Sequence, residues 1–138
     1  MSDNQLLGLD VGKVRTGVAR ASWAARLAEP LKTVHTATAA EELRELIKRY
    51  KVDTIVVGLP RNLNGEDTQQ TAWVRQWVSN IKKQLSPTFY WQDEAATSRL
   101  AERRVSTSKK NRYLADAIAA SIVLQDFIDS PQTERSSC

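Results

Sequence analysis

The 138-residue sequence has little of what several common protein chemistries require. Its single cysteine, Cys138, excludes an internal disulfide and a cysteine metal cluster. Its single histidine, His35, excludes a histidine-rich metal site, and we interpret it as a surface or loop residue. No apolar stretch approaches the roughly 20 residues that span a bilayer, and the polar start at residues 2–5 is not typical of a signal peptide. We therefore expect a cytoplasmic protein without a membrane partner, whose chemistry depends on carboxylates, lysines or hydroxyls.

The composition is that of a soluble globular protein, with 41% hydrophobic and 26% charged residues. The length predicts one domain over residues 1–130, and the polar stretch from Pro131 predicts a flexible tail over 131–138. The net charge of +4 is unevenly spread, because residues 99–112 hold six basic residues against one acid. Two interpretations of that stretch remain open, a solvated helix face with its loop and a phosphate-binding arm.

Hydrophobic periodicity predicts an alternation of strands and helices. Glycines bracket a hairpin between the first two strands, and Asp67 or Asn64 is the expected N-terminal cap of the second helix. The last helix is apolar around most of its circumference and is expected to be buried. The expected strands cover residues 5–10, 14–21, about 31–34, 53–59 and 88–92, the expected helices cover 39–50, 67–85, 94–104 and 113–128, and 106–111 is expected to be a loop. This order indicates an α/β fold with a mixed sheet.

Three separated segments place acids where water is scarce. Asp10 and the pair Asp93–Glu94 end strand-like runs, and Asp116 shares a helix face with apolar residues. Carboxylates brought together repel one another unless a divalent cation is shared between them. Magnesium and manganese accept carboxylate oxygens and need neither cysteine nor histidine. The other interpretation, that each acid caps a helix or pairs with a basic residue, remains open from the sequence.

Four segments together resemble the signature segments of one family. They read LLGLDVGKVRTGVA, IVVGLPRNLNG, WQDEAATS and ADAIAASIVLQ, and they lie in the right order over residues 5–129. They look like the YqgF family, also called RuvX, which is similar to the RuvC Holliday-junction resolvases. The resemblance implies a ribonuclease H-like fold with a mixed five-stranded sheet flanked by helices.

The same resemblance implies a metal-dependent nuclease. Its catalytic and metal-binding acids would be Asp10, Glu94 and Asp116, with Mg²⁺ or Mn²⁺ as cofactor, and the choice between Asp93 and Glu94 stays open. The implied task is maturation of pre-16S rRNA, and an older proposal is Holliday-junction resolution. The sequence departs from the family where Ala95 follows the acid pair in place of an arginine. A nucleic-acid-binding assembly factor that cleaves weakly is therefore an alternative.

Basic residues near these segments are candidates for contact with the phosphates of a precursor rRNA or a branched DNA. They are Lys13, Arg15, Arg61, Lys109, Lys110 and Arg112. Among the tryptophans, Trp77 and Trp91 are expected in the core, whereas Trp23 and Trp73 are expected to be exposed contacts. Whether the protein is a monomer or a homodimer stays open. The hairpin after Asp10 also resembles the phosphate-binding hairpin of the actin, sugar-kinase and chaperone ATPases, but this chain is long enough for only half of such a protein.

Overall fold

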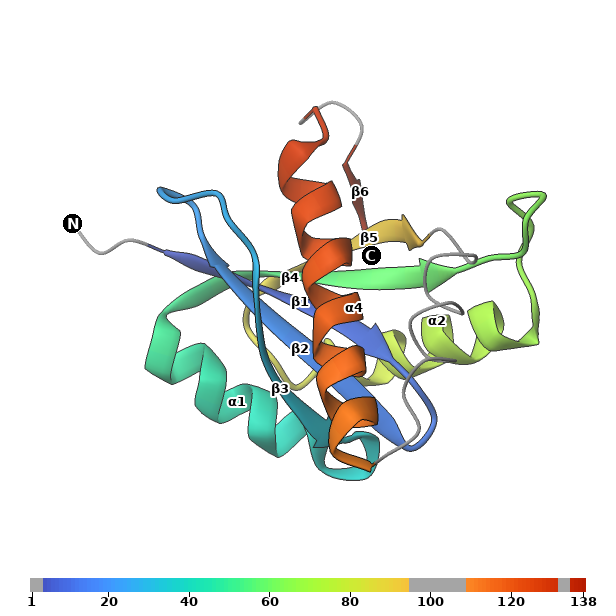
Figure 1. Cartoon of the computed structure of the whole chain (residues 1–138), viewed down its shortest axis with the longest axis horizontal. Coiled ribbons are helices and arrows are strands. Elements are labelled where there is room, and N and C mark those ends of the chain that lie inside the picture. The colour runs from blue at the N-terminus through green and yellow to red at the C-terminus, as the bar shows by residue number, and fades with distance from the viewer. Residues whose placement is uncertain (1–3, 95–108, 132–134) are drawn as a thin grey trace.

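A computed structural model gives the structure of the chain and describes residues 4–94, 109–131 and 135–138. The described part holds a six-stranded sheet in the order β3-β2-β1-β4-β5-β6 (Figure 1). The strands are β1 (Gln5–Val11), β2 (Arg15–Ser22), β3 (Glu29–His35), β4 (Val52–Pro60), β5 (Thr88–Glu94) and β6 (Ser136–Ser137). The helices are the 3₁₀ turn η1 (Thr36–Thr38), α1 (Ala39–Tyr50), α2 (Gln69–Ile81) and α4 (Lys109–Asp129).

The sheet is mixed, which confirms the predicted fold class. Strand β1 pairs antiparallel with β2 and parallel with β4, and β5 runs parallel to β4. Strand β4 is central, as its β-branched run predicted. The expected number of five strands is wrong by one, because Ser136 and Ser137 pair antiparallel with Trp91 and Tyr90. These serines have no hydrophobic pattern that predicts a strand. They form one because the edge of β5 offers unpaired backbone groups for hydrogen bonding.

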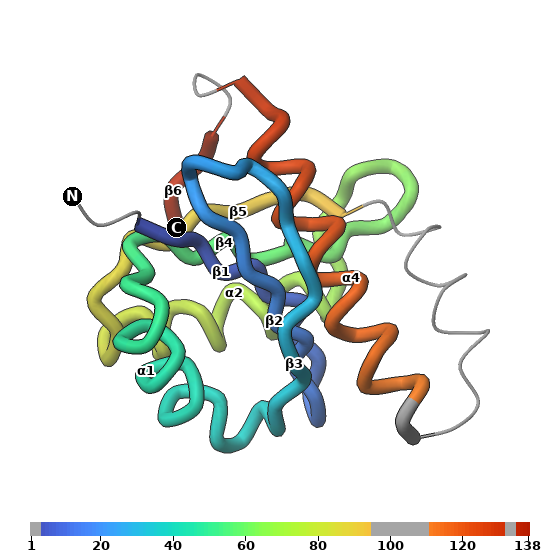
Figure 2. Tube along the Cα trace, turned by 60° about the vertical axis from the view of Figure 1, so that its left-hand side comes forward, coloured from blue at the N-terminus to red at the C-terminus, as the bar shows by residue number. Residues whose placement is uncertain are grey.

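The two faces of the sheet are covered by different helices. Figure 2 shows α1 and α2 on one side of the strands and α4 on the other. On β1, Leu7 and Leu9 pack in one buried cluster with residues of α1 and α2, whereas Leu6 packs in a second cluster with residues of α4. Because side chains alternate along a strand, Asp10 points to the α4 side together with Leu6. This alternation decides which side chains meet at the carboxyl ends of β1, β4 and β5.

Helix α2 begins later than predicted and has a different cap. Thr68 is its N-cap, and its hydroxyl accepts a hydrogen bond from the backbone N–H of Thr71 while the Thr71 hydroxyl accepts one from the N–H of Thr68. This reciprocal pair is a capping box. The expectation that Asp67 or Asn64 caps the helix is therefore wrong, because the Asp67 carboxylate binds arginines instead.

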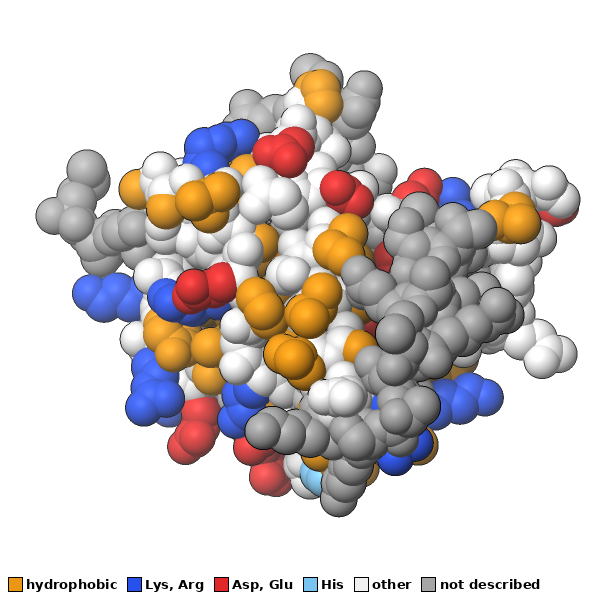
Figure 3. All heavy atoms as spheres, viewed as in Figure 1, with side chains coloured by type: hydrophobic (Ala, Val, Ile, Leu, Met, Phe, Trp, Pro, Cys, Tyr) orange, Lys and Arg blue, Asp and Glu red, His pale blue; other side chains and the backbone are white. Residues whose placement is uncertain are grey.

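Helix α4 is longer and less buried than predicted. It begins at Lys109, so residues 109–111 are helical rather than part of a loop, and the expected helix over 94–104 lies almost entirely outside the described residues. Ala120, Val123 and Phe127 are buried with Asp116, as the periodicity predicted. Leu114 and Ile122 are exposed, however, and Figure 3 shows hydrophobic side chains gathered over α4. The helix lies on the sheet with one face and presents the other to solvent.

Within the described ranges, no helix has the length and apolar character needed to cross a membrane. The division into a domain over residues 1–130 and a flexible tail over 131–138 stays a prediction. Inside that tail, the backbone N–H of Cys138 donates to the Phe89 carbonyl, next to the strand β6.

Candidate functional site

Asp10 is completely buried near the end of the central strand β1. Its Cα is paired with Gly17 of β2 on one side. On the other side, Leu9 is paired with Val57 of β4, which brings Gly58 beside Asp10. The carboxylate is thus flanked by two glycines and points to the face that α4 covers.

Gly17 allows α4 to approach the sheet closely at this point. A Cβ atom added to Gly17 would lie 1.9 Å from the backbone carbonyl oxygen of Asp116. Only glycine leaves room for the helix here. The buried Asp116, with 2% of its surface exposed, therefore lies against the strand residue that pairs with Asp10.

Arg15 binds Asp116 rather than projecting freely toward solvent. Its Nε donates to Asp116 Oδ2 over 2.7 Å, and its guanidinium carbon lies 5.7 Å from the centre of the Tyr113 ring. A buried carboxylate costs much less free energy when a cation compensates it. Arg15 was predicted to contact nucleic acid, and the structure places it as the partner that fixes the Asp116 side chain.

The acid pair at the end of β5 is divided between the two faces of the sheet. Glu94 lies over Gly58, since a Cβ atom added there would be 1.9 Å from Glu94 Oε1. Asp93 points the other way, is exposed, and lies 3.6 Å from Nη1 of Arg61. Glu94 is therefore the acid of the pair that shares a face with Asp10 and Asp116.

The donor chemistry of this face fits a hard divalent cation, because Asp10, Glu94 and Asp116 all offer carboxylate oxygens. Two of the three carboxylates are buried, where an ion would offset their mutual repulsion. Among the described residues, no three His, Cys, Asp or Glu side chains already stand close enough together to hold a metal ion. The three elements thus bring the right residues to one region, and ion binding would have to draw their carboxylates together.

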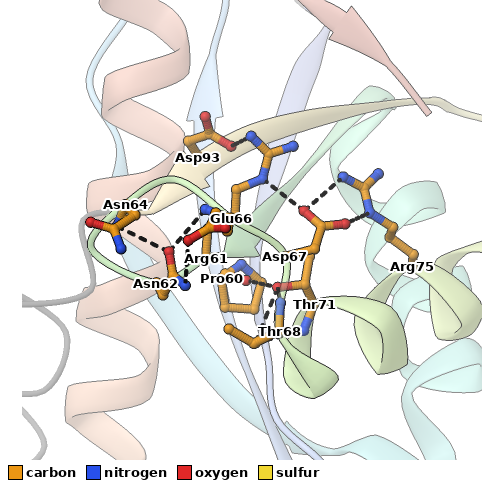
Figure 4. Close-up of polar contacts among 10 residues, drawn as sticks. All are labelled: Pro60, Arg61, Asn62, Asn64, Glu66, Asp67, Thr68, Thr71, Arg75 and Asp93. Carbon is orange, nitrogen blue, oxygen red and sulfur yellow. Dashed lines mark hydrogen bonds and ion pairs between the residues drawn. The ribbon is translucent and has the colours of Figure 1, made fainter.

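A second polar network surrounds the turn between β4 and α2 (Figure 4). Asp67 binds two arginines, with Arg61 Nε at 3.1 Å from Oδ1 and Arg75 Nε at 3.0 Å from Oδ2. The hydrogen bond from Arg75, helped by the charge of Arg61, holds the pKa of Asp67 below its ordinary value. The Asn62 side chain accepts hydrogen bonds from the backbone N–H groups of Asn64 and Glu66, which closes the turn. The predicted contact residue Arg61 is therefore held in place by carboxylates.

The other predicted contacts differ in their placement. Lys13 and Arg112 are exposed, so both can meet a phosphate backbone. Lys109 and Lys110 lie in the first turn of α4. Trp77 and Trp91 pack against the core as predicted, but Trp23 and Trp73 are half-buried rather than exposed. Trp23 also donates from Nε1 to Asp53, which accounts for its orientation.

Two features of the site were missed from the sequence. The close approaches at Gly17 and Gly58 leave no local signal beyond the glycines themselves. Arg75, whose guanidinium carbon lies 5.4 Å from the centre of the Trp91 ring, lines a pocket of about 380 Å³ together with Arg61 and Asp93. The position of Arg75 on the helix that follows Asp67 was the one sequence feature that pointed to an Arg75–Asp67 pair.

Comparisons with known proteins agree with this architecture. The family model RuvX, described as Holliday junction resolvase, matches residues 4–130. A relative from Roseiflexus sp. (strain RS-1) is 37% identical over 133 residues, covering 91% of this chain and 94% of the relative. A relative from Mycoplasma mobile is 33% identical over 131 residues, covering 90% of this chain and 91% of the relative. Both carry the name "Putative pre-16S rRNA nuclease".

The fold is also that of a solved resolvase. The structure "T. thermophilus RuvC in complex with Holliday junction substrate" matches with a TM-score of 0.60 and 15% identity, covering 98% of this chain and 99% of that one. This likeness confirms the predicted ribonuclease H-like fold. The match of the family model over residues 4–130, with relatives up to 37% identical, shows that the chain belongs to the RuvX family, as its four sequence segments predicted.

Proposed function

We propose that this protein is a divalent-metal-dependent nuclease that hydrolyses phosphodiester bonds in structured nucleic acid, most directly in the maturation of pre-16S rRNA. The observation that supports this most strongly is the burial of Asp10 and Asp116 on adjoining elements, with Glu94 on the same face of the sheet. Two buried carboxylates cost stability, so their presence side by side, one near the end of β1 and one on α4, indicates a functional role.

In this proposal Asp10, Glu94 and Asp116 hold Mg²⁺ or Mn²⁺. Such ions, when bound, activate the attacking water and stabilise the leaving oxygen of a phosphodiester. The chain itself supplies the orientation. Arg15 is a positioning residue that fixes the Asp116 carboxylate, and the fully buried position of Asp10 restricts its rotation.

Exposed cations near the site would hold the substrate backbone. Lys13 follows Gly12 in the β1–β2 hairpin, and Arg112 lies in α4 one turn before Asp116. Contacts of this kind position the strand without reading its sequence, and they make binding weaken with salt. In this way the basic side chains bind the phosphates of the substrate and hold the strand next to the carboxylates.

The names of the relatives favour rRNA as the substrate, which would place this protein in the cytoplasm as expected from its sequence. A branched DNA is the second candidate, because the family description is that of a Holliday junction resolvase and the similar RuvC structure holds a junction. Either a monomer or a homodimer is expected to act on these substrates.

The proposal is tested by cleavage of labelled pre-16S rRNA and of a four-way DNA junction, each with Mg²⁺, Mn²⁺ or EDTA. We expect metal-dependent cutting of the rRNA that Asp10→Asn and Asp116→Asn abolish. The matched control is Asp126→Asn on the same helix. Burial, together with the charge of Asp129, raises the pKa of Asp126, so losing its charge should not destabilise the fold.

Three results would each lead to a different conclusion. Cleavage of the DNA junction but not of the rRNA would show that the protein acts on branched DNA. Cutting that survives both substitutions would overturn the carboxylate site. Salt-sensitive binding with no cutting of either substrate would identify a binding factor and implicate Ala95, where the family usually has an arginine.

A further inference from the structure

A pocket of about 380 Å³ lies at the edge of β5, just beyond the strand β6. Strand β6 pairs with Tyr90 and Trp91, and the pocket begins where that pairing ends. Its lining includes the basic residues Arg61 and Arg75 and the hydroxyl residues Ser130 and Ser136. Its volume falls within the range of sites that bind small organic groups.

The Arg75 guanidinium is held in a fixed position in this pocket. It lies over the Trp91 ring, 5.4 Å from the ring centre, and its edge binds Asp67 through Nε at 3.0 Å and Nη2 at 3.5 Å. The Arg75 side chain nevertheless keeps 38% of its surface exposed. A guanidinium packed on an aromatic ring and bound along its edge is an ordered, planar surface on which a nucleobase can stack.

An anion next to that surface can be bound by the two arginines of the same pocket. Arg61 and Arg75 share the carboxylate of Asp67, and the four charged groups are balanced only when Asp93, which also lines the pocket, is counted. The second acid near Arg61 is Asp93, whose closest oxygen is 3.6 Å away and whose side chain is 67% exposed. Such a long, exposed contact is weak, so a phosphate can replace Asp93 at Arg61.

We propose that this pocket binds one unpaired nucleotide of the nucleic-acid substrate, with its base stacked on Arg75 and its phosphate at Arg61. The inference rests on the proposed function, because it needs a nucleic-acid substrate bound at Glu94. Asp93 lines the pocket, and the next residue, Glu94, lies on the opposite face of β5. A strand that bends around this end of β5 would place the nucleotide in the pocket and the neighbouring phosphodiester at the carboxylates. The protein would thereby select substrates with a single-stranded segment beside the cleaved bond.

The experiment measures binding in EDTA, so that no cleavage takes place. The main probe is a duplex with a single-stranded overhang that carries one 2-aminopurine. The overhang is made as a 5′ or a 3′ extension, and as RNA or DNA. The control probe is the same duplex with blunt ends. The variants are Arg75→Ala, Arg75→Lys and, as the matched control, Arg44→Ala on α1, where the arginine is exposed and outside the pocket. Stacking quenches 2-aminopurine and reports directly on the base.

Arg75→Ala should lower the affinity for the better overhang probe about tenfold and relieve the quenching, while blunt-duplex binding stays unchanged. Arg75→Lys should restore neither the affinity nor the quenching, because lysine keeps the positive charge but lacks the planar guanidinium on which a base stacks. An equal loss for Arg75→Ala and Arg44→Ala, or full restoration by lysine, would overturn the proposal, because either result describes a general charge effect. The better of the RNA and DNA probes identifies the source of the nucleotide.

A second variant guards against a folding defect. Asp67→Asn keeps the Arg75 side chain but removes the carboxylate that orients it, so the quenching of 2-aminopurine in the bound overhang should weaken several-fold. Quenching is the readout for this variant, because loss of the Asp67 charge by itself strengthens the attraction of a phosphate, and urea unfolding is measured beside it. Unaltered quenching in this variant and in Arg75→Ala would overturn the pocket even if the enzyme cuts rRNA. Loss of quenching in both, in a protein that cuts nothing, would uphold the pocket and overturn the nuclease activity.

Discussion

Gly58 lies beneath the Glu94 carboxylate, and replacing it with alanine tests what that carboxylate does. The added Cβ would lie 1.9 Å from Glu94 Oε1 and 2.6 Å from Cδ, whereas ordinary van der Waals contact begins near 3.4 Å. The carboxylate must therefore move by about 1.5 Å or more. Glu94 Cγ would lie 2.9 Å from the same Cβ, so the whole side chain must rotate about its Cα–Cβ bond, and all three clashing atoms belong to that side chain rather than to the backbone of β5.

This geometry predicts a large effect on rate and a small one on stability. A misplacement of about 1 Å in a catalytic group costs roughly 100-fold in rate. Relieving a clash by rotating one side chain costs about 1 kcal/mol, at the low end of the range for an overpacked site. We expect Gly58→Ala to cleave on the order of 100-fold more slowly while its free energy of unfolding falls by no more than about 1 kcal/mol.

The assay is the single-turnover rate of rRNA cleavage with Mg²⁺, measured beside urea unfolding. The decisive comparison is a double-mutant cycle with Glu94→Gln, because residues that act as a unit are not additive. Gly58→Ala should slow the wild type strongly and slow Glu94→Gln hardly at all. A wild-type rate in Gly58→Ala, or the same fold loss in both backgrounds, would refute the assignment of Glu94 to the centre.

Three further predictions follow from contacts in the same structure. Gly17→Ala places its Cβ 1.9 Å from the backbone oxygen of Asp116 and forces α4 to move, so urea unfolding should show a loss of about 1–3 kcal/mol; an unchanged midpoint would contradict the helix position. Arg15→Gln removes a charged hydrogen bond from a buried carboxylate and should cost about 1.5–3 kcal/mol, with part of the loss restored by Mg²⁺; stability equal to wild type in EDTA would show that Arg15 does not hold Asp116. Burial raises the pKa of the Cys138 thiol to about 12, so iodoacetamide at pH 8 should alkylate it roughly a thousandfold more slowly than in the urea-unfolded chain; comparable rates would mean that the thiol is exposed.

Much of the fold follows from local pattern. The β-branched run of β4 predicted a central strand, and the spacing of Leu43 and Leu46 predicted the buried face of α1. Asp116 was predicted to share a face with Ala120 and Phe127, and all three are buried. These features were accessible because each depends on residues close together in the chain.

Features that depend on distant partners were not accessible. The pairing of Arg15 with Asp116 joins residues 101 positions apart, and no local pattern marks it. Strand β6 forms because the edge of β5 offers free backbone groups, which a pair of serines does not reveal. Which of Asp93 and Glu94 lies on the α4 side of the sheet depends on the pairing of β5 with β4, and the structure places Glu94 there, over Gly58.

If Asp10, Glu94 and Asp116 together bind a divalent cation, the protein must bind Mn²⁺ through these carboxylates. The measurement is a titration of the full chain with Mn²⁺, in which electron paramagnetic resonance counts the free ion, for wild type, Asp10→Asn and the control Asp126→Asn. We expect saturable binding by wild type and Asp126→Asn, and a loss of roughly tenfold or more in affinity for Asp10→Asn. Equal binding by Asp10→Asn and wild type would contradict metal binding by these carboxylates.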